Sequence, residues 1–265
     1  MIQMHIPNLN LRQIAESGQA FRWVKADENT YSVISAGKFL TIKEDGEDFT
    51  FSCSQKEWDE YWSTYFDMET DYVAIGSLIE KSGDEHLLKA YKEGKGVRIL
   101  KQDLWEIIVT FMISQNNNIA RITKSVAALC EAAGKKTCGG YAFPKPGEVD
   151  PEVFEKKELG FGYRAEYLRE IYDFAAGNPQ WMEKLKGLSY EEAMEELLLR
   201  KGIGKKVANC ICLFGLHHVD AFPIDTHVKQ LLEKYYPNGF DFEYFKGVAG
   251  IIQQYLFYYE LRHPE

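Results

Sequence analysis

A lysine and an aspartate at the starts of two predicted helices are the residues best suited to covalent chemistry. Lys206 follows the turn Gly202-Ile203-Gly204, and Asp225 lies nineteen residues further on, just before the next helix. The positive end of a helix dipole favours the neutral, nucleophilic amine over the ammonium, and it stabilises a capping carboxylate. Together the two residues predict an amine nucleophile beside a fixed carboxylate. A solvated lysine and a simple helix cap are the alternative explanation for each residue alone.

The glycine pair before the lysine predicts a phosphate-binding turn. Two glycines two positions apart let the backbone turn sharply and approach a ligand closely. The free N–H groups of the helix that begins at Lys205 point toward this turn, which makes an anion site. A DNA phosphate suits that geometry, but so does any other phosphate. Taken alone, such a motif is more often a tight turn with a glycine cap.

The elements that must position these residues differ between the two parts of the chain. β-branched and aromatic runs separated by turn residues predict an antiparallel meander, and helical periodicity dominates afterwards. We therefore expect an α+β fold, with a small N-terminal antiparallel sheet domain and flanking helices at residues 1–97 and a mainly α-helical helix–hairpin–helix domain at residues 98–265. The predicted strands cover residues 21–24, 31–35, 38–42 and 49–51, and the predicted helices cover 104–112, 119–129, 165–176, 190–199, 205–215, 226–236 and 244–261.

The charge of the chain argues, at first, against a nucleic-acid partner. The 265 residues carry 31 basic and 40 acidic side chains, a net charge of −9, whereas phosphate binding usually shows as a basic surface. The acidity is local, because residues 40–95 hold 6 basic against 14 acidic side chains. Residues 111–145 hold 5 basic against 1 acidic, and residues 200–234 hold 6 against 3. The segment with the glycine pair is thus locally positive.

The cysteines and the apolar runs indicate a soluble, cytoplasmic protein without a metal. Five cysteines at irregular spacings do not form a disulfide framework, and Cys210-Ile211-Cys212 lacks the spacing of a zinc site. No uncharged apolar run approaches the roughly 18 residues that a membrane span requires. With 45% hydrophobic residues, the chain can bury one or two full cores. We expect no cofactor.

Four segments, in order along the chain, are similar to those of a known enzyme family. They resemble the 8-oxoguanine DNA glycosylase/lyase branch of the helix–hairpin–helix, Gly/Pro-Asp DNA glycosylase superfamily. The resemblance implies a DNA glycosylase domain whose C-terminal helix closes a base pocket. The similar segments are residues 17–23, 114–122, 159–165 and 199–227.

The resemblance implies a bifunctional enzyme of base excision repair. Lys206 would attack C1′ of the damaged nucleotide and displace 8-oxoguanine, and Asp225 would stabilise the positive charge that develops on the sugar. The resulting Schiff base would permit β-elimination and strand nicking. The implied partner is double-stranded DNA with oxidised guanine. We expect no membrane partner, a monomer, and a cytoplasmic, nucleoid-associated location in a prokaryote.

The resemblance also assigns the residues that would hold the flipped base and the DNA. A backbone carbonyl at Gly18 would recognise the extra N7–H of 8-oxoguanine, while Ala20 stands where relatives often carry serine and leaves ring-opened purines open as substrates. Gln253 would read the base edge, Phe257 would stack on the base, and Cys210 would line the pocket. Asn116, Arg121 and Arg164 would fill the gap and hold the unpaired cytosine, Tyr163 would wedge between bases, and Gly202, Gly204 and His227 would contact phosphates.

Three other functions are consistent with parts of this pattern. An alkylation-repair glycosylase of the 3-methyladenine type could use the same fold and an aromatic cleft, but it would not need Lys206. A non-catalytic helix–hairpin–helix module would use Gly202 and Gly204 and would have no joint task for Lys206 and Asp225. A metabolic enzyme with a lysine Schiff base would leave the glycine hairpin without a purpose.

Overall fold

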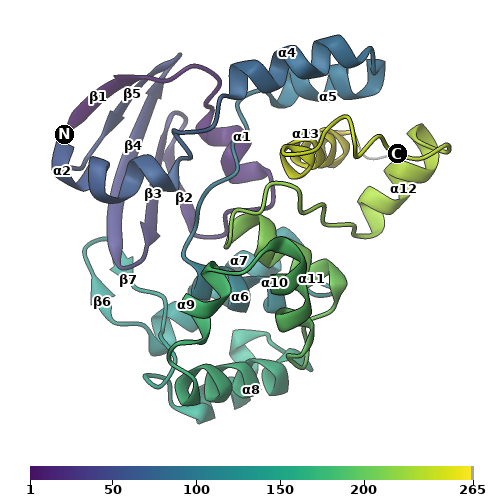
Figure 1. The fold of residues 1–265 in the computed structure, drawn as a ribbon. Coiled ribbons are helices and arrows are strands. Elements are labelled where there is room, and N and C mark those ends of the chain that lie inside the picture. The colour runs from purple at the N-terminus through teal and green to yellow at the C-terminus, as the bar shows by residue number, and fades with distance from the viewer. Residues whose placement is uncertain (264–265) are drawn as a thin grey trace.

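An antiparallel sheet lies beside a larger helical body in the structure, a computed structural model that describes residues 1–263 (Figure 1). The sheet has the strand order β1-β5-β4-β3-β2, and all its neighbours pair antiparallel. The turn between β3 and β4 is tight because Ala36 and Gly37 both adopt positive φ, the conformation that two-residue hairpins prefer. The strands are β1 (Ile2–His5), β2 (Trp23–Asp27), β3 (Thr30–Ser35), β4 (Lys38–Asp45) and β5 (Asp48–Phe51).

Short helical segments bury their apolar side chains against this sheet. Trp58, Trp62 and Phe66 pack with Phe51 in a cluster of aromatic rings. This aromatic cluster belongs to the first hydrophobic core, which also holds apolar side chains of the strands and of α1. The segments are α1 (Leu11–Glu16), α2 (Gln55–Glu57), a π-helical turn (Trp58–Trp62) and α3 (Ser63–Tyr65).

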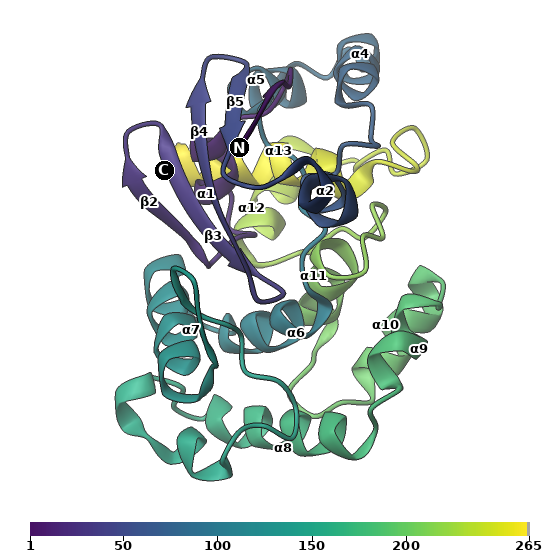
Figure 2. The same ribbon diagram turned by 90° about the vertical axis from the view of Figure 1, so that its left-hand side faces the viewer.

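A second hydrophobic core joins the remaining helices. The central helix α6 (Leu104–Ile113) is buried along its whole length, and α7, α8 and α11 surround it (Figures 1 and 2). Buried residues of α4 and α5 belong to this second core although they precede residue 97. The other helices are α4 (Tyr72–Ser82), α5 (Glu85–Gly94), α7 (Ile119–Ala133), α8 (Arg164–Gly177), α9 (Trp181–Lys186), α10 (Tyr190–Leu198), α11 (Lys205–Phe214), α12 (Thr226–Tyr235) and α13 (Ala249–Arg262).

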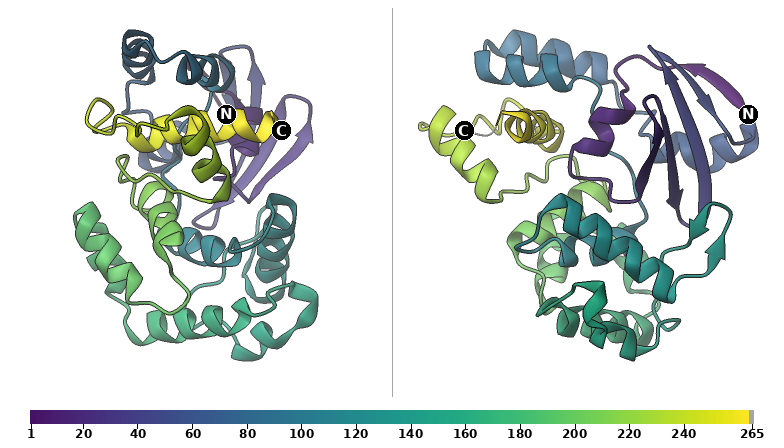
Figure 3. Two further views of the ribbon diagram at one scale, coloured as in Figure 1. Left: turned by 90° about the vertical axis from the view of Figure 1, so that its right-hand side faces the viewer. Right: turned by 180° about the vertical axis from the view of Figure 1, so that it is seen from behind.

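The last helix, α13, packs beside α5 at the top of the molecule (Figures 1 and 3). It is almost wholly buried, and Gly94 of α5 gives Tyr258 room to approach. The C-terminal helix thus lies far along the chain from α5 but next to it in space. A small hairpin, β6 (Lys136–Thr137) and β7 (Gly140–Tyr141), follows α7, and two 3-10 turns, Pro151–Glu155 and Lys157–Leu159, precede α8.

The α+β prediction is confirmed, and the differences in detail have local causes. The sequence analysis gave no range for the edge strand β1 or for the helices α4, α5 and α9. The strand β1 and the helix α9 are too short to show a clear period. The predicted helix 244–261 begins only at Ala249, because residues 241–248 form turns and Gly247 adopts a φ of +85°. Within residues 1–263, no helix combines the length and the apolar character needed to cross a membrane.

Two buried charge clusters connect the sheet side to the helical body. Arg22, at the start of β2, forms an ion pair with Glu106 of α6 at 3.1 Å, with both side chains less than a tenth exposed. Burial raises the pKa of the Glu106 carboxyl to about 7, although Arg22 acts in the opposite direction. Asp67, after α3, forms ion pairs with Lys101 and with His217, each at 3.2 Å. His217 lies between α11 and α12, so this cluster ties three distant segments together.

Candidate active site

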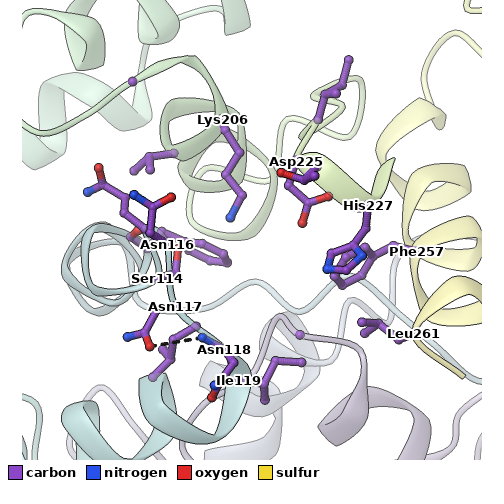
Figure 4. Close-up of a pocket in the computed structure, with 18 of the residues that line it drawn as sticks. Ser114, Asn116, Asn117, Asn118, Ile119, Lys206, Asp225, His227, Phe257 and Leu261 are labelled. Atoms are coloured by element: carbon purple, nitrogen blue, oxygen red, sulfur yellow. Dashed lines mark hydrogen bonds between the residues drawn. The ribbon is translucent and has the colours of Figure 1, made fainter. Parts of the chain in front are cut away.

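A cleft of about 1240 Å³ opens where α11, α12 and α13 face the junction of α6 and α7 (Figure 4). Its walls come from both ends and the middle of the chain, from Gly18 to Leu261. None of its lining residues belongs to the acidic stretch 40–95. Of the residues predicted to act in catalysis or binding, Gly18, Asn116, Lys206, Asp225, His227 and Phe257 line this cleft, as does Gly204.

Lys206 projects into the cleft from the first turn of α11, as predicted. Its Nζ lies 5.3 Å from the centre of the Phe111 ring, and this ring stacks on Phe214. The thiol of Cys210, one helical turn further along α11, interacts with this amine. Burial raises the pKa of the Cys210 thiol, against the opposing effect of Lys206. The lysine side chain therefore packs over an aromatic ring, with a neutral thiol beside it.

Asp225 is the N-cap of α12, which confirms the prediction from the sequence. Its Oδ1 accepts a hydrogen bond from the backbone N–H of Val228 at 2.9 Å. This bond fixes the carboxylate, and Figure 4 shows Asp225 and Lys206 both extending into the same cavity. A cation that develops between them would meet a carboxylate whose position is already set.

Gly18 is placed against Phe257 by the segment that follows it. The neighbouring Gln19 donates to the carbonyl of Arg98 at 2.8 Å and accepts from the N–H of Leu100 at 2.9 Å. Gly18 has a φ of +75°, and a Cβ on it would lie 3.0 Å from Phe257 Cε1. Both the backbone conformation and the close ring therefore require glycine at this position.

A second, inner cavity lies between Lys206 and the buried helix α13. Its volume is about 40 Å³, room for no more than a few water molecules, so a base enters only if the walls move. The Gln253 side chain donates from Nε2 to the carbonyl of Pro223 at 3.1 Å. Gly18, Cys210, Gln253 and Phe257 all line this cavity together with Lys206 and Asp225. The predicted catalytic and base-reading residues thus meet in one place.

The glycine hairpin is held against α8 and is separate from the inner cavity. Gly202 has a φ of +81°, and a Cβ on it would lie 2.6 Å from the Tyr167 ring. Lys201 forms ion pairs with Glu166 and Glu170, each at 2.7 Å. Gly202 therefore sets the shape of the turn and does not line the cleft, whereas Gly204 does and has open space around it.

The residues predicted to face the opposite DNA strand form a connected loop at the edge of the cleft. Asn116 has a φ of +46° and donates from Nδ2 to the hydroxyl of Tyr163, which is half exposed. The buried guanidinium of Arg164 donates to the carbonyls of Gln115, Asn116 and Phe161. Arg164 thus holds the Asn116 loop in this structure, while Arg121 is exposed on α7.

Several residues of the site escaped the sequence analysis. Phe111, which underlies Lys206, showed only as part of an apolar helix face, which gives no sign of a cavity. Gln115 donates from Nε2 to the carbonyl of Gly202 at 2.9 Å and so joins the Asn116 loop to the hairpin. Residue types alone gave no signal for either role. Across residues 1–263, no group of three or more His, Cys, Asp or Glu side chains is placed to hold a metal ion.

The chain is similar in sequence to known proteins of one enzyme family. A family model described as the N-terminal domain of 8-oxoguanine DNA glycosylase matches residues 1–108. The N-glycosylase/DNA lyase of Saccharomyces cerevisiae is 32% identical over 259 residues, which cover 86% of this chain and 68% of that protein. The N-glycosylase/DNA lyase of Arabidopsis thaliana is 30% identical over 236 residues. The aligned region covers 83% of this chain and 64% of that protein. The chain thus spans about two thirds of the length of these relatives.

A solved structure extends the similarity to almost the whole chain. It is the Clostridium acetobutylicum 8-oxoguanine glycosylase/lyase in complex with double-stranded DNA that contains cytosine opposite 8-oxoguanine. It matches with a TM-score of 0.89 and 35% identity, over 97% of this chain and 93% of that one. The similarity therefore includes both the sheet and the helical body.

Proposed function

The chain belongs to the 8-oxoguanine DNA glycosylase/lyase family and is an N-glycosylase/DNA lyase, and we propose that Lys206 is its nucleophile. The observation that carries the proposal is the placement of Lys206 opposite Asp225 in a cleft lined by the predicted base-binding residues. An amine that attacks a sugar carbon needs a neutral nitrogen and a site for the developing positive charge. Asp225, fixed at the N-terminus of α12, supplies the site for that charge.

The proposed reaction proceeds in two stages. Lys206 Nζ bonds to C1′ of the damaged nucleotide while the bond from C1′ to the base breaks, and the base leaves with the bonding electrons. The sugar ring then opens to a Schiff base between Nζ and C1′, which makes the C2′ proton acidic. Loss of that proton expels the 3′ phosphate and nicks the strand. Asp225 stabilises the positive charge on the sugar in the first stage.

Substitution of the lysine tests the nucleophile. Borohydride should trap a covalent adduct between the protein and duplex DNA that carries 8-oxoguanine, and Lys206→Gln should abolish both the trapped adduct and strand nicking. Lys205→Gln is the matched control, because Lys205 precedes it on α11, is exposed and lines the same cleft. Trapping that survives in Lys206→Gln, or that is lost in Lys205→Gln, would contradict the assignment.

We further propose that the base flips into the inner cavity and that cytosine is preferred opposite it. Gly18, Gln253 and Phe257 would contact the base, since all three line the cavity beside Lys206. Asn116 and Tyr163 would occupy the gap in the duplex. Arg121 is free to approach the cytosine, whereas Arg164 would have to exchange at least one of its bonds to backbone carbonyls.

Excision opposite each of the four bases tests the strand preference. Cleavage opposite cytosine should be faster than opposite adenine, because arginine donors suit the O2 and N3 acceptors of cytosine. Arg121→Leu should lower this ratio without changing the melting temperature, and Arg164→Leu should lower both, because it releases the Asn116 loop. Equal rates opposite cytosine and adenine in the wild-type protein would remove the basis for the assignment.

We propose that one chain acts alone on double-stranded DNA in a reducing, cytoplasmic compartment. A single chain supplies every residue assigned above, and all five cysteines are free. Gly202, Gly204 and His227 would hold phosphates, mostly through backbone N–H groups and helix dipoles. Sedimentation of the protein with and without a short duplex distinguishes a monomer from a dimer.

A further inference from the structure

We propose that Gln254, which follows the base-reading Gln253 on α13, is a positioning residue that orients the Gln253 amide for a guanine-type base. The two side chains are each 3% exposed and line the same inner cavity. The proposal rests on the proposed function, because it concerns how the excised base is recognised. It adds a residue that determines specificity without attacking the sugar.

Two neighbours, Pro223 and Gln254, hold the Gln253 amide in the same orientation. The oxygen of Pro223 can only accept a hydrogen bond, so the Gln253 atom that faces it at 3.1 Å must be Nε2. Gln253 Oε1 then faces Gln254, which must present its own nitrogen. Gln254 Nε2 does donate to Gln253 Oε1, at 3.2 Å. Rotation of either amide would bring two oxygens or two N–H groups face to face.

This arrangement leaves one buried polar atom without a partner. Gln254 Oε1 is fully buried and has no hydrogen-bond partner in the described part of the chain. A buried acceptor without a donor destabilises a protein, and an apolar side chain of the same length would avoid that cost. Stability alone therefore does not account for glutamine at this position. Its one satisfied bond is the bond to Gln253.

The consequence is a fixed donor and acceptor pattern inside the cavity. The Watson–Crick edge of a guanine-type base donates through N1–H and the 2-amino group, and it therefore needs an acceptor. With Gln254 in place, Gln253 offers Oε1 at a defined position and still has a free lone pair. Without Gln254, only the 3.1 Å bond to Pro223 would hold the Gln253 amide, which would then turn over more readily and offer N–H groups that suit an adenine-type edge. Gln254 thus favours oxidised guanine over oxidised adenine.

Gln254→Met tests the proposal, because methionine keeps the length and removes the donor. Excision of 8-oxoguanine should fall about tenfold in kcat/KM, and the preference for 8-oxoguanine over 8-oxoadenine should shrink. Nicking of duplex that already contains an abasic site should stay unchanged, because that substrate has no base to read. The melting temperature should stay equal or rise. Tyr255→Phe is the matched control. Like Gln254→Met, it removes a buried polar atom without a partner from α13, here the hydroxyl of Tyr255, and it should change nothing.

A double-mutant cycle separates positioning from direct contact. If Gln254 acts through Gln253, then Gln253→Met and the double variant Gln253→Met/Gln254→Met should lose the same activity. Additive losses, unchanged excision in Gln254→Met, or equal losses on abasic DNA would each overturn the proposal. Failure of the proposed function looks different, because the wild-type protein itself would then neither excise 8-oxoguanine nor form a trapped adduct.

Discussion

Each side chain of the proposed reaction is held in place by its neighbours. Lys206 lies over Phe111 and beside the neutral thiol of Cys210, and Asp225 is fixed by its cap bond to Val228. A charge that forms in such a partly dry cleft interacts more strongly with a fixed carboxylate than it would in water. Gly18 contributes differently, since its lack of a side chain is what lets Phe257 close the inner cavity.

Gly18→Ala should impair base recognition by two separate effects. A non-glycine residue at positive φ costs about 1–2 kcal/mol, and the new methyl group would collide with Phe257. Excision of 8-oxoguanine should therefore fall about tenfold or more in kcat/KM, while nicking of abasic DNA should fall less. The measurement is the ratio of the two rates in single-turnover assays.

Gly37→Ala separates the two effects of that change. Gly37 has nearly the same φ, +76°, but nothing lies near its missing side chain. It should share the backbone cost and keep full excision. An equal loss of excision in both variants would mean that the contact between Gly18 and Phe257 is unimportant.

At the scale of elements, two helix N-termini and one hairpin position the residues of the proposed reaction. α11 carries Lys206, α12 carries Asp225, and the turn before α11 is clamped to α8 through Lys201 and its two glutamates. Gln115 links the same turn to the Asn116 loop. The hairpin thus sets the direction of α11 and connects the proposed nucleophile, Lys206, to the loop that we propose to face the opposite strand.

The two hairpin glycines should respond differently to alanine. Gly202→Ala should destabilise the protein by about 3 kcal/mol, because positive φ and the Tyr167 ring both oppose a side chain. Gly204→Ala should cost less than about 1 kcal/mol, since its φ is −91° and its surroundings are open. If the Gly204 backbone approaches a phosphate, Gly204→Ala should still weaken DNA binding. Denaturant unfolding measures the loss of stability, and binding of an abasic-site duplex measures the loss of affinity. Wild-type affinity in Gly204→Ala would exclude the contact between the Gly204 backbone and a phosphate.

The whole molecule brings together segments that are far apart in sequence. The sheet side supplies Gly18, the helical body supplies Lys206 and Asp225, and the last helix supplies Gln253 and Phe257. The domain boundary expected at residues 97 and 98 remains a prediction, and α4 and α5 share their core with the second part. The acidic stretch 40–95 contributes nothing to the cleft, so the net charge of −9 does not describe the proposed DNA-binding face.

The Asp67 cluster should make the packing of the sheet side against the helical body sensitive to acid. Burial raises the pKa of Asp67, but His217, Thr70 and Tyr72 together lower it from 3.8 to about 2. Because the folded-state pKa lies below the unfolded one, the stabilisation is present above about pH 4 and is lost as the pH falls through about 2. It amounts to about 2 kcal/mol.

Asp67→Asn should therefore unfold more easily at neutral pH and lose part of the pH dependence between about 4 and 2. Denaturant unfolding across that range is the measurement. Asp45→Asn, at the exposed end of β4, is the control and should behave like the wild type. A variant of Asp67 with wild-type stability at pH 7 would show that the cluster does not hold the two parts together.

The sequence by itself determined the features that depend on neighbouring residues. The cap at Asp225, the turn before Lys206, the strand meander and most helices follow from spacing and local propensity, and the structure has them in place. Four similar segments also identified the family. These signals act over a few residues, so a single chain carries them without reference to its fold.

Only the tertiary structure decided how these features meet. The aromatic ring under Lys206, the carbonyl bonds of Arg164 and the amide pair of Gln253 and Gln254 join residues that are up to 95 positions apart. The contact between Gly18 and Phe257 spans almost the whole chain. Such contacts depend on the packing of whole helices against one another, and packing is set by the shapes of both partners at once. For this reason the residues proposed for the chemistry could be named from the sequence, whereas the contacts proposed to hold the base required the fold.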